Sequence, residues 1–307
     1  MNEGFSYAKT SKEQYYQEVK ISDLRKIHIR KFIAHIVYGK SLHHLTNKDD
    51  EIINEIISKM ENTLDTKFLT EVKNNNIYTL RFGNNKIHST YKPSIIYFGL
   101  KFVKINCYNK FQKLKFIKYK TNNDVTYWTS KIDTNKQTSI FIHGFGLGPF
   151  PYMDWIKDMN KYINLIVLVL PNMSNLEYSD KLFPTYSNFK EDFKEIIKKF
   201  NLFKVSVIAH SFGTVIAGCY LKDQDICKYI DNLILYEPIC FFEGCYKIFK
   251  HINQNHKGSW KEKLIKLFIY KDVYVRYVTQ RFMFGPEFWI LNYKNINNIS
   301  KNLYLHS

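Results

Sequence analysis

An apolar strand that breaks on a tight turn and continues as an apolar helix is the feature that most constrains the fold of this chain. Residues 205–218 read VSVIAHSFGTVIAG. The small residues Ala209 and Gly213 leave room for the backbone to double back sharply at Ser211. A hydroxyl on such a turn is both exposed and fixed, as a nucleophile must be, so the pattern predicts a nucleophile elbow.

Short apolar runs alternate with helical patterns around this turn. Apolar strands are expected at residues 139–142, 165–170, 205–209 and 233–236, with helices at 152–162, 189–200 and after the elbow. Strands that are apolar throughout are buried on both faces, which predicts βαβ units and a mostly parallel, doubly wound sheet. Ligands bind at the carboxyl ends of such strands, where His143, Ser211 and Glu237 fall.

The first 112 residues follow a different pattern. A helical stripe covers residues 21–37, a second helix is expected to begin at Asn47 as its cap, and asparagine-rich stretches then indicate a loosely organised region up to about residue 110. We therefore expect a mainly helical extension over 1–112 and a second domain over 113–307. A hairpin of residues 114–119 and 125–128 would open the second domain.

A glycine-rich turn follows the strand at residues 139–142 and reads HGFGLG over residues 143–148. Together with the serine turn, it resembles the α/β-hydrolase superfamily, in which these two motifs form an oxyanion hole and a nucleophile. The resemblance covers residues 114–307 and implies the α/β-hydrolase fold, with a helical lid over about residues 243–295. Each motif alone also fits an ordinary loop, but their order, spacing and strand contexts agree.

The resemblance assigns a role to each candidate site residue. Ser211 would be the nucleophile, and the backbone amides of Phe145 and Phe212 would hold the oxyanion. Glu237 stands after the sixth strand, where some members of the superfamily place the catalytic acid, and it would orient a histidine. His143 is expected to support the turn rather than act as a base.

The carboxyl-terminal part departs from the superfamily pattern. Residues 302–306 are expected to begin a seventh strand, so the conventional acid and histidine, which follow the seventh and eighth strands, are not found in the sequence. We expect a domain that is shortened at the C-terminus and lacks the usual last strand. The histidines left as candidate bases are His251, His256 and His306.

Lysine dominates the charge of the chain. The formal net charge is +17, and residues 101–136 and 247–281 each carry nine Lys or Arg against two acids. Basic residues among aromatics fit a solvated basic face, an anionic membrane surface or nucleic acid. No nucleic-acid module accompanies the charge, so nucleic acid is the disfavoured partner.

Cysteine usage and the amino terminus indicate the compartment. Five cysteines without a C-x-x-C pair argue against a disulfide framework and against a zinc site. The first residues lack the apolar core of a signal peptide, and no apolar stretch reaches the roughly 18 residues of a spanning helix. We expect an intracellular, cytoplasmic protein that holds no metal and no cofactor.

The sequence thus predicts a serine hydrolase that cleaves a carboxylic ester. The abundance of Phe, Tyr, Ile and Leu between residues 241 and 290 favours an apolar, lipid-like acyl group. The alternative is a catalytically impaired homologue that binds a membrane or a protein partner, because the conventional acid and histidine are not found.

Overall fold

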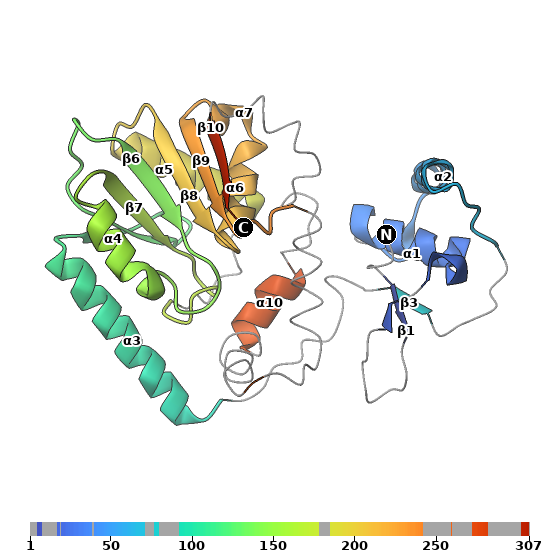
Figure 1. Ribbon diagram of the computed structural model, residues 1–307, viewed down its shortest axis with the longest axis horizontal. Coiled ribbons are helices and arrows are strands. Elements are labelled where there is room, and N and C mark those ends of the chain that lie inside the picture. Colours follow the sequence, from blue (N-terminus) through green and yellow to red (C-terminus); the bar gives the residue numbers. More distant parts are fainter. Residues whose placement is uncertain are drawn as a thin grey trace.

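The computed structural model describes residues 5–7, 17–18, 20–38, 40–70, 77–79, 92–177, 185–241, 259, 272–281 and 302–306. Figure 1 shows a large sheet flanked by helices in the carboxyl-terminal two thirds of the chain, and a group of helices and short strands in the amino-terminal third.

A seven-stranded sheet is the centre of the larger part. Its order is β10-β9-β8-β6-β7-β5-β4, and β5 alone runs in the direction opposite to the other six strands. The predicted mostly parallel sheet is therefore confirmed, as are the opening hairpin and the strand at residues 302–306. The strands are β4 (Ile117–Lys120), β5 (Thr126–Thr129), β6 (Thr138–Ile142), β7 (Asn164–Val169), β8 (Val205–His210), β9 (Ile230–Tyr236) and β10 (Asn302–His306).

Helices cover both faces of this sheet, because successive side chains of each buried strand point to opposite faces. Ile140 and Ile142 of β6 belong to a core cluster with α5, α6 and α10, whereas Phe141 between them belongs to a second cluster with α3 and α4. The helices are α3 (Ser94–Lys113), α4 (Met153–Met159), α5 (Tyr186–Lys199), α6 (Gly213–Leu221), α7 (Gln224–Cys227) and α10 (Val273–Arg281).

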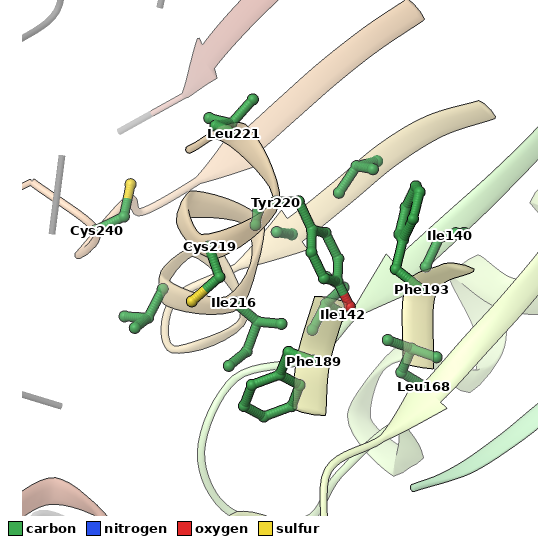
Figure 2. Close-up of a cluster of buried hydrophobic side chains, with 14 of the residues drawn as sticks. Ile140, Ile142, Leu168, Phe189, Phe193, Ile216, Cys219, Tyr220, Leu221 and Cys240 are labelled. Atoms are coloured by element: carbon green, nitrogen blue, oxygen red, sulfur yellow. The ribbon is translucent and has the colours of Figure 1, made fainter. Parts of the chain in front are cut away.

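The first cluster is the larger of the two. Figure 2 shows side chains of α5 and α6 meeting those of the strands, namely Phe189, Phe193, Ile216, Tyr220, Ile140, Ile142 and Leu168. Val278 of α10 also packs into it. Residues 259 and 272–281 are the described part of the predicted lid, which itself stays a prediction.

A buried carboxylate ties the β4–β5 hairpin to α5. The Asn123 side-chain amide donates to Asp192 Oδ1 at 3.1 Å, and the Asn122 N–H donates to Glu195 at 2.9 Å. Asp192 is only 3% exposed, and this burial raises the pKa of its carboxyl to about 6.

The amino-terminal third has a core of its own. Short strands β1 (Phe5–Tyr7), β2 (Gln17–Glu18) and β3 (Ile77–Thr79) form a sheet of order β2-β1-β3. Helices α1 (Lys26–Tyr38) and α2 (Asn47–Thr63) pack with it around a cluster that includes Ile29, Ile33, Ile53 and Ile57. Single turns of 3-10 helix lie at η2 (Ile21–Asp23), η3 (Leu42–His44) and, in the larger part, η4 (Phe150–Tyr152).

The cap predicted for α2 was wrong by one residue. Thr46, not Asn47, is the N-cap, and its hydroxyl accepts from the Asp49 N–H while the Asp49 carboxylate accepts from the Thr46 N–H. This reciprocal capping box pairs two backbone N–H groups that have no carbonyl partner within the helix. A single asparagine cap pairs only one.

Helix α3 contradicts the loosely organised region predicted up to residue 110. Its buried side chains Cys107 and Phe111 pack in the second cluster, whereas Phe98 and Phe102 lie exposed on the outer side. Because apolar residues lie on both sides of this helix, its sequence lacks the one-sided apolar stripe by which the other helices were predicted. The domain boundary near residue 112 stays a prediction.

A buried ion pair joins the start of α3 to the start of α10. Lys92 Nζ lies 2.6 Å from Asp272 Oδ2, and the two side chains are 1% and 3% exposed. Asp272 Oδ1 also accepts from the N–H groups of Tyr274 and Val275, so this carboxylate caps α10 as well.

Replacing Lys92 by Met is expected to lower the free energy of unfolding by about 3–5 kcal/mol, because Asp272 is then buried without its cation. Urea denaturation of the full chain measures the change. As the matched control, Lys59→Met removes the exposed pair with Glu55 and is expected to leave the midpoint nearly unchanged. Equal midpoints for both variants would contradict the assignment of a structural role to the buried pair.

Replacing Asp192 by Asn is expected to stabilise the protein above about pH 6 and to change little near pH 4. The folded pKa lies above the ordinary value of 3.8, so the folded state binds more protons between these values and its stability falls as pH rises. At neutral pH the ionised Asp192 carboxylate is expected to lower the free energy of unfolding by an amount on the order of 3 kcal/mol. Thermal unfolding at several pH values tests this, with exposed Asp154→Asn as control.

Candidate active site

Ser211 lies on a strained turn between β8 and α6. Its φ is +49°, in the left-handed region that non-glycine residues rarely adopt. The Ser211 N–H donates to the Tyr236 carbonyl at 2.9 Å, and its own carbonyl accepts from the Thr214 N–H and hydroxyl at 2.9 and 2.6 Å. The predicted strand-to-helix turn is thus present, with Ser211 at its apex.

The turn requires a glycine two residues after the serine. A Cβ on Gly213 would lie 2.3 Å from the Ile142 carbonyl oxygen, which is too close for any side chain. The start of α6 therefore touches the backbone at the end of β6, and the smallness expected of this position has a direct structural reason.

The glycine-rich turn after β6 lies against the elbow. A Cβ on Gly144 would come within 3.0 Å of both Ser211 Cβ and His210 Nδ1. The rings of Phe145 and Phe212 are in contact, with centroids 4.6 Å apart. The structure thus brings together the three residues predicted for the nucleophile and the oxyanion hole.

His143 is a fully buried support of this turn. Its Nε2 accepts from the Leu170 N–H at 3.1 Å, so Nδ1 carries the proton and donates to the Gly144 carbonyl at 2.6 Å. Burial lowers the pKa of His143 to about 4, which keeps the ring neutral. Carbonyl and amide of one trans peptide point in opposite directions, so this bond also fixes the direction of the Phe145 N–H.

A second loop, between β7 and α5, holds the turn from its other side. The Gly146 N–H donates to the Met173 carbonyl at 3.1 Å, and the Asn175 N–H donates to the Gly146 carbonyl at 2.7 Å. Gly148 has a φ of +56°, and a Cβ there would lie 2.5 Å from Ser174 Oγ. The backbone of Gly146 thus pairs with this loop, and Gly148 leaves room for the Ser174 side chain.

Glu237 reaches a histidine that sequence reasoning missed. Its Oε2 lies 3.3 Å from His210 Nε2, and His210 Nδ1 lies 2.7 Å from Tyr152 Oη. A carboxylate only accepts, so Nε2 carries the proton and, in the neutral ring, Nδ1 accepts from the Tyr152 hydroxyl. Burial raises the pKa of Tyr152, so this hydroxyl keeps its proton. The available signal in the sequence is the position of His210 directly before Ser211.

The three candidate bases are placed differently. His251 and His256 lie outside the described residues. His306 ends β10 in register with Tyr236, which also pairs with His210 of β8. The backbone of His306 therefore lies at the carboxyl edge of the sheet that also carries Ser211 and Glu237.

Two features now occur together on one sheet. A serine stands on a strained strand-to-helix turn at the carboxyl end of β8, and a glycine-rich turn follows β6, the third strand in chain order. Both turns stand at the positions that the α/β-hydrolase architecture gives them. The chain has the α/β-hydrolase fold. The resemblance predicted from the two sequence motifs is therefore confirmed at the level of the fold.

Comparisons with known proteins find similar solved structures but no match to a protein family. No protein-family model matches the chain, and no curated protein matches it. Among solved structures, the chain is similar to the α/β hydrolase MGS-M2 from a Medee basin deep-sea metagenome library, with 11% identity, 61% of this chain and 78% of that chain covered, and a TM-score of 0.45.

Two further solved structures are similar to the same extent. One is 2-hydroxy-6-oxo-6-phenylhexa-2,4-dienoate hydrolase from a Rhodococcus species, with 11% identity, 62% and 80% coverage of the two chains, and a TM-score of 0.44. The other is a structure from work on carboxylesterases of Nitrososphaera gargenis, with 14% identity, 62% and 79% coverage, and a TM-score of 0.44.

The described residues contain no metal-binding cluster, and two of their free thiols are poorly reactive. No three His, Cys, Asp or Glu side chains among them gather in a way that can hold a metal ion. Cys107, Cys219, Cys227 and Cys240 are free thiols, and burial raises the pKa of Cys107 and Cys240 to about 12, so these two are poor nucleophiles. No described helix combines the length and apolar character needed to cross a bilayer.

Replacing Tyr152 by Phe is expected to loosen the turn at residues 143–148, because His210 loses its donor. Amide exchange in this segment is expected to become about five- to tenfold faster, the equivalent of one neutral hydrogen bond. Hydrogen–deuterium exchange with peptide-level detection measures the change. Tyr162→Phe is the control, since Tyr162 is 73% exposed. Unchanged exchange in the Tyr152 variant would show that His210 is held without this hydroxyl.

Proposed function

We propose that this chain is a serine hydrolase that cleaves a carboxylic ester. The observation that carries the proposal is the left-handed backbone of Ser211, whose φ is +49°, at the apex of the turn that adjoins Gly144. Strain of this kind persists only where the surrounding structure enforces it, and it clusters at active sites.

In the proposed reaction, Ser211 Oγ attacks the ester carbonyl carbon and the alcohol leaves, so that an acyl-enzyme forms and water then hydrolyses it. The amides of Phe145 and Phe212 are the proposed donors to the oxyanion. Support comes from the contact of their rings and from His143, which fixes the peptide that contains the Phe145 N–H.

The proton of Ser211 needs a base. Both ring nitrogens of His210 are already engaged, by Glu237 and Tyr152, so we assign His210 and Glu237 a positioning role in the turn. The base is then one of the downstream histidines, and His306 is supported by its register at the carboxyl edge of the sheet.

The substrate class rests on composition. Phe, Tyr, Ile and Leu are abundant between residues 241 and 290, the segment predicted to form the lid. Such a lining would favour an apolar acyl group, so we propose a lipid-like ester. The cytoplasmic location of the chain stays a prediction.

A fluorophosphonate probe is expected to label the purified protein on Ser211, and Ser211→Ala is expected to abolish the labelling. Hydrolysis of p-nitrophenyl octanoate is expected to exceed that of the acetate. In the Ser211 variant only the ~10³- to 10⁴-fold acceleration that an oxyanion hole and binding provide would remain. Peptide mass spectrometry locates the adduct, and hydrolysis is followed by absorbance.

Ser187→Ala is the matched control, because Ser187 is an exposed serine in the regular helix α5 and not on a strained turn. It is expected to be labelled like the wild type. Folded wild-type protein that takes no label would overturn the proposal and favour the alternative of a binding module.

A further inference from the structure

The outer face of α3 is an apolar stripe exposed to solvent. Ile95, Phe98, Phe102 and Ile105 are 75%, 68%, 69% and 49% exposed. Their spacing of three, four and three residues places them on one side of a helix, opposite the side through which α3 packs in the core. The stripe thus runs along the amino-terminal half of a 20-residue helix.

Exposed apolar side chains concentrate on this helix. Five of the fifteen large hydrophobic residues that are exposed in the described part of the chain lie on α3, and Ile117 follows on β4. Single exposed apolar residues are normal on a protein surface, but a continuous row of them marks a binding surface.

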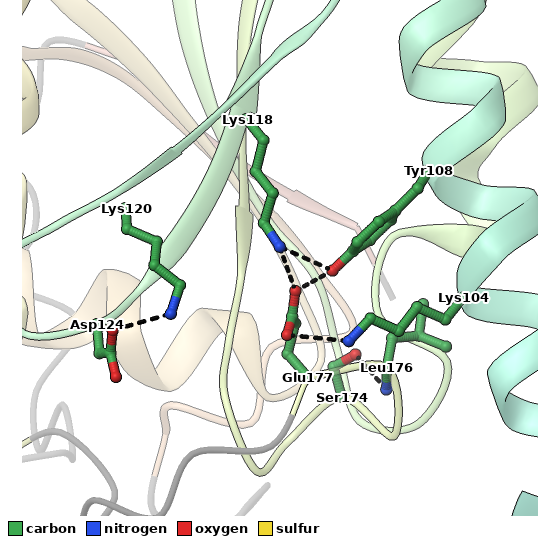
Figure 3. Close-up of polar contacts among 8 residues, drawn as sticks. All are labelled: Lys104, Tyr108, Lys118, Lys120, Asp124, Ser174, Leu176 and Glu177. Atoms are coloured by element: carbon green, nitrogen blue, oxygen red, sulfur yellow. Dashed lines mark hydrogen bonds and ion pairs between the residues drawn. The ribbon is translucent and has the colours of Figure 1, made fainter.

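The charge around the stripe has one sign. Residues 94–120 contain no acid and seven lysines, namely Lys101, Lys104, Lys110, Lys113, Lys115, Lys118 and Lys120. Figure 3 shows two carboxylates that reach this group from outside. Glu177 pairs with Lys104 at 3.3 Å and Lys118 at 3.0 Å and accepts a hydrogen bond from Tyr108. Asp124 pairs with Lys120 at 2.9 Å. For Lys101, Lys113 and Lys115, the described residues supply no ion pair.

We propose that α3 docks this chain on an anionic membrane surface. Phe98 and Phe102 would enter the boundary between headgroups and acyl chains, while the lysines would meet the lipid phosphates and carboxylates. The charge decides between this occupant and a second copy of the chain, because a symmetric dimer through α3 would place two lysine-rich faces against each other.

Helix α3, which carries the docking face, is linked both to α10 and to the loop that holds the glycine-rich turn. The Lys92–Asp272 pair ties the Ser94 end of α3 to α10, in the predicted lid segment. Glu177 belongs to the loop between β7 and α5, whose Met173 and Asn175 bind Gly146 of the glycine-rich turn. A membrane bound by α3 would therefore be linked to α10 through the buried ion pair and to the glycine-rich turn through a single loop.

Vesicle sedimentation of the full chain tests the proposal. Wild-type protein is expected to bind vesicles in which about a third of the lipid is phosphatidylserine far more tightly than pure phosphatidylcholine, and to lose affinity as salt rises. Phe98→Ser/Phe102→Ser is expected to weaken binding about tenfold or more, through the lost apolar burial. Lys101→Glu/Lys113→Glu is expected to abolish the preference for phosphatidylserine.

The controls change the same residue types elsewhere. Phe203→Ser removes an aromatic ring that is 77% exposed on a loop, and Lys48→Glu/Lys67→Glu reverses two exposed charges in the amino-terminal third. All variants concern exposed side chains, and circular dichroism checks that each is folded. Binding is measured on Ser211→Ala as well, so the outcome does not depend on the proposed catalytic function.

Wild-type protein that does not bind the anionic vesicles, or an α3 variant that binds them like the wild type, overturns the proposal. Loss of a dimer or of RNA binding on substitution of Phe98 and Phe102, without any loss of vesicle binding, would identify a different occupant of this face and overturn it too.

Discussion

The contact between the first turn of α6 and the end of β6 is the constraint on which the rest of the site depends. Gly213 lies so close to the Ile142 carbonyl that no Cβ fits between them. This closeness sets the start of α6 against the sheet, and Ser211 just before it has a left-handed backbone. Because β8 lies beside β6 in the sheet, the turn after β6 then meets the elbow directly.

The glycine-rich turn is held from several directions by neutral groups. His143 binds Gly144 from inside the core, the loop of Met173 and Asn175 binds Gly146, and Gly144 packs against the ring of His210. Rigid support of this kind places amide donors before a substrate arrives, which is the main physical requirement of an oxyanion hole. The loop that helps to hold the turn is fixed on its outer side by Glu177 and two lysines, so α3 belongs to the same supporting structure.

Much of the sheet could be predicted from the sequence, because its central strands are buried on both faces and read as continuous apolar runs. The elbow could be predicted because Ala209 and Gly213 flank Ser211. Helix α3 could not, since its solvent side carries Phe98 and Phe102 where a polar stripe was required. The bond between Tyr152 and His210 joins residues 58 positions apart, and no local pattern encodes such a contact.

The ion pair between Lys92 and Asp272 has a consequence for the order of folding. Its partners stand 180 positions apart, and the strands from β4 to β9 lie between them. Closing a loop costs more entropy as it lengthens, so distant partners meet only after intervening structure has shortened the path. We therefore expect the pair to form late in folding, after strands β4 to β9 have paired, and to fix the start of α10 against α3.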